Sequence, residues 1–88
     1  MTNELSGQII KRLPIVEGTS SRGAWKKQTL VIETTDQYPK KVAIDFWNDK
    51  VDELPKFFDG QNVTISINIE SKESNERWFT EVKGWKIV

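Results

Sequence analysis

Tryptophan and lysine side chains occupy outward positions on two neighbouring segments in the middle of the chain. Trp25 and Lys27 alternate with inward positions such as Leu30, and this period of two indicates a half-buried strand. Lys41 and Trp47 take the outward positions of the next predicted strand. Bases stack on aromatic rings, and lysine and arginine bind phosphates. This face of the two strands is therefore predicted to bind a single-stranded nucleic acid.

Three further side chains extend the candidate interface. Arg22 flanks the first predicted loop, and Arg77 and Trp78 open the last strand beside the loop that precedes it. Asp45 lies outward between two aromatic positions and would repel phosphate, which counts against nucleic acid at that point. The sequence also allows a second interpretation, in which both outward tryptophans cover one end of a barrel or a surface of self-association.

The chain has no histidine and no cysteine, so the commonest general base and the thiol nucleophile are missing. Catalysis would then need paired carboxylates or an activated lysine, which are not suitably spaced here, and no phosphate loop or nucleophile elbow occurs. The acidic residues Asp49, Asp52, Glu53 and Asp59 do not match a calcium loop and are explained by helix capping. We therefore predict no enzyme, no metal site and no cofactor.

Length and charge set further limits. The 88 residues predict one domain, residues 1–88. Thirteen basic and thirteen acidic side chains give zero net charge, with three excess positive charges in residues 1–44 and three excess negative charges in residues 45–88. This balance excludes a strongly basic, indiscriminate nucleic-acid binder but leaves room for a local basic patch. Residues 1–4 are polar and no apolar run approaches a signal peptide or a membrane span, so we expect a cytoplasmic protein without membrane contact.

The hydropathy pattern predicts five strands and one short helix. The strands fall over residues 5–12, 25–34, 40–47, 63–69 and 77–88. The helix follows the third strand, begins with Asn48 as its cap and ends at Gly60. Residues 17–23 and 71–76 are predicted to be polar loops, and Gly84 is predicted to mark a bulge. This order matches an all-β fold with one short helix, the five-stranded antiparallel Greek-key OB barrel.

The inward positions predict which side chains form the core. On the strands they are Leu30, Ile32, Val42, Ile44, Phe46, Val63, Ile65 and Ile67. On the helix, Leu54 and Phe58 share one face and are predicted to seal one end of the barrel. Phe57 is predicted to lie in the core as well.

Several short motifs resemble those of a known family. They are Gly23-x-Trp25-x-x-Gln28-x-Leu30-x-Ile32-Glu33, Ile44-x-Phe46-Trp47, Phe57-x-x-Gly60-x-x-Val63 and Trp78-Phe79-Thr80-Glu81-Val82. The chain, from about Leu5 to Val88, looks like a family of short bacterial and phage proteins of unknown function. That family in turn resembles, at low similarity, the OB domains of bacterial single-stranded-DNA-binding proteins. The resemblance implies an OB barrel but does not by itself assign an activity, because OB barrels also serve as protein-interaction modules.

Two functions of different classes follow. The first is a module that binds single-stranded nucleic acid, DNA ahead of RNA, with low sequence preference. The second is an OB barrel that serves protein interaction or oligomerisation without nucleic acid. Neutral net charge favours the second function, and outward tryptophan and lysine on the same strands favour the first. Self-association is expected to use strand pairing or outward apolar residues such as Val31.

Overall fold

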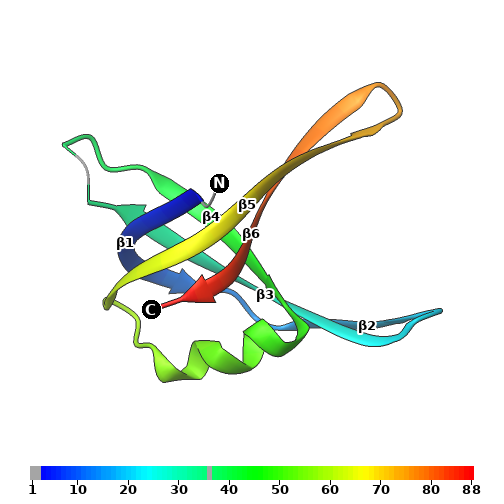
Figure 1. Ribbon diagram of the computed structural model, residues 1–88, viewed down its shortest axis with the longest axis horizontal. Helices are drawn as coiled ribbons and strands as arrows, with labels where there is room; N and C mark the ends of the chain where they lie inside the picture. Colours follow the sequence, from blue (N-terminus) through cyan, green and yellow to red (C-terminus); the bar gives the residue numbers. More distant parts are fainter. Residues whose placement is uncertain (1–2, 36) are drawn as a thin grey trace.

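The computed structural model describes residues 3–35 and 37–88, which form one six-stranded sheet and one 3₁₀ helix (Figure 1). The sheet order is β1-β5-β6-β4-β3-β2, and β1 also pairs with β3, so five of the strands close into a barrel. The elements are β1 (Asn3–Arg12), β2 (Val16–Ser20), β3 (Gly23–Thr34), β4 (Lys41–Trp47), η1 (Asn48–Lys56), β5 (Asn62–Ser74) and β6 (Arg77–Ile87). The predicted barrel is confirmed, with one strand more than predicted.

Closure of the barrel depends on β1, which pairs with β5 through one part of its length and with β3 through another. Gly7 lies opposite both Thr34 and Val63 at the point where the two pairings overlap. A Cβ atom at Gly7 would lie 2.4 Å from the carbonyl oxygen of Glu33, so this close approach requires glycine. On the other side of the barrel, β4 and β6 meet in a parallel bridge between Asp45 and Lys83. The barrel is therefore not antiparallel throughout, which corrects the prediction.

The core lies inside the barrel and is formed by the alternate side chains of β3, β4 and β5 that point inward. Seven of the eight predicted core residues are buried, and Val42 packs against them half-buried. Ile9, Val51 and Ile87 complete the interior together with Leu54. The inward positions of β3 are confirmed, which fixes its odd positions on the outward side.

The helix η1 closes one end of the barrel, although not with the predicted residues. Leu54 is fully buried, but Phe58 is 74% exposed, so its predicted place in the core is wrong. The backbone is already extended at Phe57, which ends the helix, and Phe57 packs against the core in its place. The predicted cap is also wrong, because the Asn48 Oδ1 atom accepts a hydrogen bond from the backbone N–H of Lys26. No helix in residues 3–35 and 37–88 is long and apolar enough to span a membrane.

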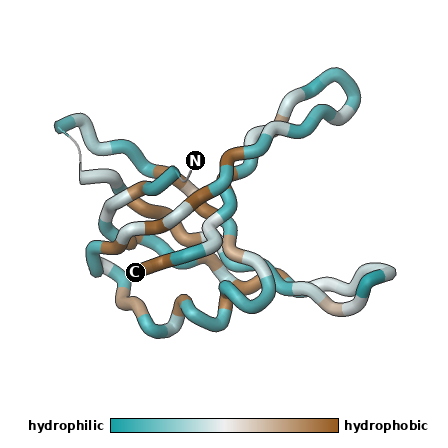
Figure 2. The backbone as a smooth tube through the Cα atoms, viewed as in Figure 1, coloured by the Kyte–Doolittle hydropathy of each residue, from teal (hydrophilic) through white to brown (hydrophobic). Residues whose placement is uncertain are grey.

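Two hairpins extend beyond the barrel where loops were predicted (Figure 1). Residues 17–23 belong to β2 and its turn into β3, and we call this hairpin the β2–β3 arm. Residues 71–76 continue β5 and β6 to a turn at Asn75 and Glu76, and we call residues 68–83 the β5–β6 arm. Both turn residues have positive φ, 52° and 67°, as a two-residue hairpin turn requires. The tips of both arms are hydrophilic (Figure 2), which is why the sequence suggested loops.

Arg12 joins the end of β1 to the end of the helix. Its Nη1 and Nη2 atoms donate hydrogen bonds to the carbonyl oxygens of Leu54 and Phe57, at 3.1 and 2.7 Å. Its Nε atom lies 3.6 Å from Oδ1 of Asp59. The side chain is only 23% exposed, so these bonds are partly shielded from water. Arg12 therefore satisfies the carbonyl group of Phe57 just beyond the helix and adds a second bond to that of Leu54, which already accepts from the backbone N–H of Phe57.

Replacing Arg12 with methionine tests this role. Arg12→Met keeps an unbranched side chain but removes both hydrogen bonds that the charged guanidinium group donates to the carbonyl oxygens. The free energy of unfolding should therefore fall by about 1.5–3 kcal/mol. Urea denaturation measures the change. Lys11→Met is the matched control, because Lys11 is exposed in the same strand, and it should change stability by less than about 0.5 kcal/mol. Equal effects of the two substitutions would contradict this account of Arg12.

Candidate nucleic-acid interface

The pairing of β3 with β4 brings together three of the predicted site residues. Lys27 lies directly opposite Trp47, and Trp25 lies two residues along on the same outward side. The ring centroids of Trp25 and Trp47 are 5.7 Å apart at an interplanar angle of 52°. The Nζ atom of Lys27 lies 5.5 Å from the Trp47 ring centroid, within the range of a cation–π interaction. We call Trp25, Lys27 and Trp47 the tryptophan cluster.

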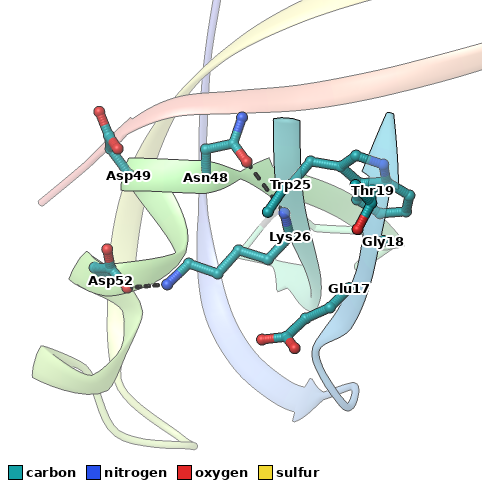
Figure 3. A pocket seen from close by; sticks show the side chains of 9 residues that line it. Glu17, Gly18, Thr19, Trp25, Lys26, Asn48, Asp49 and Asp52 are labelled. Atoms are coloured by element: carbon teal, nitrogen blue, oxygen red, sulfur yellow. Dashed lines mark hydrogen bonds and ion pairs between the residues drawn. The ribbon is translucent and has the colours of Figure 1, made fainter. Parts of the chain in front are cut away.

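A glycine in the β2–β3 arm supports the Trp25 ring. Gly18 lies opposite Trp25 in the pairing of β2 with β3, and the ring lies beside the β2 strand (Figure 3). A Cβ atom at Gly18 would lie 2.4 Å from Cζ2 of Trp25, so the ring rests directly against the backbone. The sequence analysis missed Gly18, because it placed this residue in a loop. Its position opposite Trp25 was visible only once β2 was known to be a strand.

The buried side of the cluster contains an unusual polar atom. The Nε1 atom of Trp47 is buried and has no hydrogen-bond partner among residues 3–35 and 37–88. A buried donor without an acceptor costs about 1–3 kcal/mol. Unsatisfied groups of this kind are rare in folded proteins.

The opposite side of the β2–β3 arm has a different charge. Lys26 points toward η1 and pairs with Asp52, whose hydrogen bond raises the pKa of the lysine (Figure 3). An open groove lies here, lined by Glu17, Asp49 and Asp52 together with Asn48 and Lys26, and it extends to Gly18 and Trp25. Three carboxylates against one ammonium group would repel phosphate. Of the two sides of this arm, only the outward side is suited to a polyanion.

Two of the predicted site residues lie away from the tryptophan cluster. Lys41 is at the other end of β4 from Trp47, a separation of about 20 Å for six residues of extended chain. It lies opposite Glu33, which offsets its charge. Arg22 is in the turn at the tip of the β2–β3 arm, exposed and near the outward side.

The β5–β6 arm separates the last two predicted residues onto opposite sides. Gly84 faces the core, since a Cβ atom there would lie 2.5 Å from Cε1 of Phe46. Lys83 therefore faces outward, as does its bridge partner Asp45. Counting back by twos places Arg77 on this outward side, in the part of β6 that runs toward the Lys41 end of β4, because β4 and β6 are parallel. Trp78 takes the other side, so the structure does not bring it together with Trp25 and Trp47.

Phe79, and not the predicted site residue Trp78, shares the outward side of β6 with Arg77. Its side chain is 54% exposed, and it lies opposite Lys72 in the pairing of β5 with β6. The sequence analysis missed Phe79 because the predicted bulge left the facing of the last strand undecided. The facing of Phe79 can be counted by alternation from Gly84 toward the hairpin turn. The register shift does not interrupt this count, because it lies beyond Gly84 in the opposite direction, between Ser66 and Ile67 of the partner strand.

Ion pairs offset most of the charge on the surface between Phe79 and the tryptophan cluster, where two lysines face three carboxylates. Lys83 lies 3.6 Å from carboxylate oxygens of both Glu70 and Glu81, and Lys72 lies 3.7 Å from Glu81. The carboxylate of Asp45 accepts a 2.6 Å hydrogen bond from the Thr29 hydroxyl group. These contacts reduce the repulsion predicted for this part of the surface without making it basic.

Comparisons with known proteins identify the family and the fold. The chain belongs to the family described as Domain of unknown function (DUF3127), whose model matches residues 4–88. No curated protein matches it. The similar solved structures include the three described here. The SSB domain of a Synechococcus sp. protein has a TM-score of 0.69 at 11% identity, covering 98% of this chain and 91% of that one. The second single-stranded DNA-binding protein (SSBb) of Mycobacterium smegmatis has a TM-score of 0.67 at 14% identity, with coverages of 99% and 82%.

The third structure is the small single-stranded DNA-binding protein of Streptomyces coelicolor, with a TM-score of 0.54 at 10% identity and coverages of 100% and 92%. At these identities the likeness establishes the fold alone. It confirms the predicted OB fold and the distant resemblance to single-stranded-DNA-binding proteins.

Gly18→Ala tests the geometry of the cluster. The added methyl group would overlap the ring of Trp25, which must then move away from β2. We expect a clear change in the near-ultraviolet circular dichroism of the tryptophans with little change in the far-ultraviolet spectrum. Gly23→Ala is a poor control, because Gly23 has a φ of 112°. Thr19→Ala, at the next residue of β2 on the other side, should leave the aromatic signal unchanged. An unchanged signal in Gly18→Ala would contradict the contact.

Proposed function

We propose that this member of the DUF3127 family binds single-stranded nucleic acid across the outward side of β3, β4 and β6, DNA ahead of RNA and with low sequence preference. The observation that carries the proposal is the tryptophan cluster, in which two indole rings and Lys27 meet on one outward surface. Such a group offers stacking faces and a positive charge to a strand of any sequence. The names of the similar solved structures support DNA as the ligand.

The outward side of the β5–β6 arm extends the proposed path of the strand. Phe79 lies four residues from Lys83, about 13 Å along β6, and Arg77 is two residues further. No ion pair within 4.0 Å involves Lys27 or Arg77 in the described part of the chain, so both charges are free for phosphate. A strand stacked on the cluster would therefore pass over the ion-pair network and meet a second aromatic ring with an adjacent arginine.

Charge determines how strongly such a complex depends on salt. Lys27, Arg77 and Arg22 would neutralise about three phosphates, whereas Glu33 lies opposite Lys41 and offsets its charge. At about 0.7 per phosphate on a single strand, the logarithm of the binding constant should fall with the logarithm of salt with a slope of about −2. This shallow slope suits a chain with zero net charge. The alternative function, protein interaction without nucleic acid, is favoured by the same neutral charge.

Two adjacent lysines provide a matched test. Lys27→Gln should weaken binding of an oligothymidylate of about thirty nucleotides and make the salt slope shallower by about 0.7. Lys26→Gln removes the same charge from the opposite side, where Lys26 is paired with Asp52. It should leave both the affinity and the salt slope unchanged. Titration of tryptophan fluorescence at low salt measures both. If the wild type shows no quenching, or if the two substitutions act equally, the proposed surface is wrong.

A second matched pair tests the path over the β5–β6 arm. Phe79→Ala should weaken binding by about 5- to 150-fold, the equivalent of one stacked base at about 1–3 kcal/mol. Trp78→Ala removes a larger ring from the opposite side and should have no effect on a ten-nucleotide ligand at submicromolar protein. Fluorescence anisotropy of a labelled oligonucleotide gives the affinities, and thermal unfolding checks that both variants fold. A loss in Trp78→Ala without one in Phe79→Ala would refute the path.

A further inference from the structure

The tryptophan cluster joins two parts of the fold that the sheet itself does not hold together. Trp47 is the last residue of β4, and the pairing of β3 with β4 ends where Lys27 lies opposite Trp47. Trp25 lies beyond that last pair, in the part of β3 that pairs with β2. The distance of 5.7 Å between the two ring centroids therefore depends on what fixes the β2–β3 arm to the end of β4.

Asn48 makes this connection. Gln28 lies opposite Phe46, so the next pair of the same kind toward the arm would join Lys26 to Asn48. The backbone does not complete that pair, because Asn48 has a φ of 49° and the chain turns there from β4 into η1. Instead, the Oδ1 atom of Asn48 accepts a hydrogen bond of 3.1 Å from the backbone N–H of Lys26 (Figure 3). A side-chain amide thus takes the place of a carbonyl group of the sheet.

The position uses two properties that asparagine combines. A φ of 49° lies in the left-handed region, which is costly for most residues with a Cβ atom and which asparagine tolerates. The short amide side chain also carries the acceptor that reaches the neighbouring strand. Glycine would satisfy the backbone alone, and alanine would satisfy neither requirement.

A second contact between the arm and η1 is weaker in its effect on the rings. Lys26 also pairs with Asp52, but the two side chains are 33% and 64% exposed, and exposed ion pairs contribute little. The N–H group of Lys26, by contrast, belongs to the backbone between Trp25 and Lys27. Its hydrogen bond to Asn48 therefore acts on two members of the tryptophan cluster at once.

We propose that Asn48 is the positioning residue of the tryptophan cluster and holds Trp25 beside Trp47 before nucleic acid binds. The proposal rests on the proposed function, since it assigns this arrangement of the rings to binding. Rings that are already in place lose less conformational freedom when a strand stacks on them. Asn48 acts through the backbone of Lys26 and does not itself touch the ligand.

Two asparagines with the same backbone conformation give a matched test. Asn48→Gly keeps a residue that adopts this φ readily but removes the acceptor, and Asn75→Gly makes the same change at a φ of 52° in the turn of the β5–β6 arm. In ¹⁵N-labelled protein without ligand, Asn48→Gly should shift the indole N–H signal of Trp25, which is distant in sequence, and leave that of Trp85 in place. Asn75→Gly should not shift the Trp25 signal. An unchanged Trp25 signal in Asn48→Gly, or an equal shift in both variants, would overturn the proposal.

Two further variants separate positioning from a general loss of stability. Asn48→Asp keeps an acceptor oxygen and should keep the Trp25 signal near its wild-type position. Lys26→Gln removes the ion pair but keeps the backbone N–H group, and it should also keep the signal. A shift in Asn48→Asp as large as that in Asn48→Gly, or a shift in Lys26→Gln alone, would refute the role of the amide.

Binding measurements connect the position of the rings to the ligand. Asn48→Gly should weaken binding of a ten-nucleotide oligothymidylate by about 2- to 10-fold, because the effect cannot exceed the net contribution of one hydrogen bond. Asn75→Gly should bind as the wild type does. Unchanged affinity in Asn48→Gly, despite a shifted Trp25 signal, would overturn the role in binding. A wild type that binds no oligonucleotide would reject the proposed function, whereas the Trp25 signal would still report whether Asn48 fixes the arm.

Discussion

The contact between Gly84 and the ring of Phe46 determines how the rest of the molecule is arranged. A Cβ atom at Gly84 would lie 2.5 Å from Cε1 of Phe46 and 3.1 Å from Cγ2 of Ile44, so glycine lets the β6 backbone lie directly on the core. This contact fixes which side of β6 faces inward. Because side chains alternate along a strand, it also fixes the facing of Phe79 and Trp78 in an arm that the core does not touch.

The two arms give the protein surfaces that the barrel alone would lack. The β2–β3 arm supports Trp25 on the backbone of Gly18 and separates a cationic outward side from an acidic groove. The β5–β6 arm separates a charged side, with Phe79, from an apolar side, with Trp78. In a chain with zero net charge, the charges of the two arms are therefore sorted by side rather than by segment.

Local alternation was sufficient to predict the barrel, its core and the outward positions of Trp25 and Trp47, because a period of two repeats over each strand of the barrel. It could not predict the arms, whose residues are as polar as loops. The facing of Trp78 depends on the contact of Gly84 with Phe46, 38 positions away in the chain, which no local pattern reveals. The exposure of Phe58 likewise follows from where the helix ends, a detail of one or two residues that propensity does not resolve.

The most direct test of the account uses the four tryptophans of the chain as probes. In a ¹⁵N-labelled sample at low salt, each indole N–H group gives one signal, and a ten-nucleotide oligothymidylate is added in steps. We predict that the signals of Trp25 and Trp47 shift or broaden in proportion to binding, because both rings belong to the tryptophan cluster. The signal of Trp78 should stay in place. No shift in any signal, or a shift of Trp78 while Trp25 and Trp47 remain unchanged, would contradict the proposal that the outward side binds single strands.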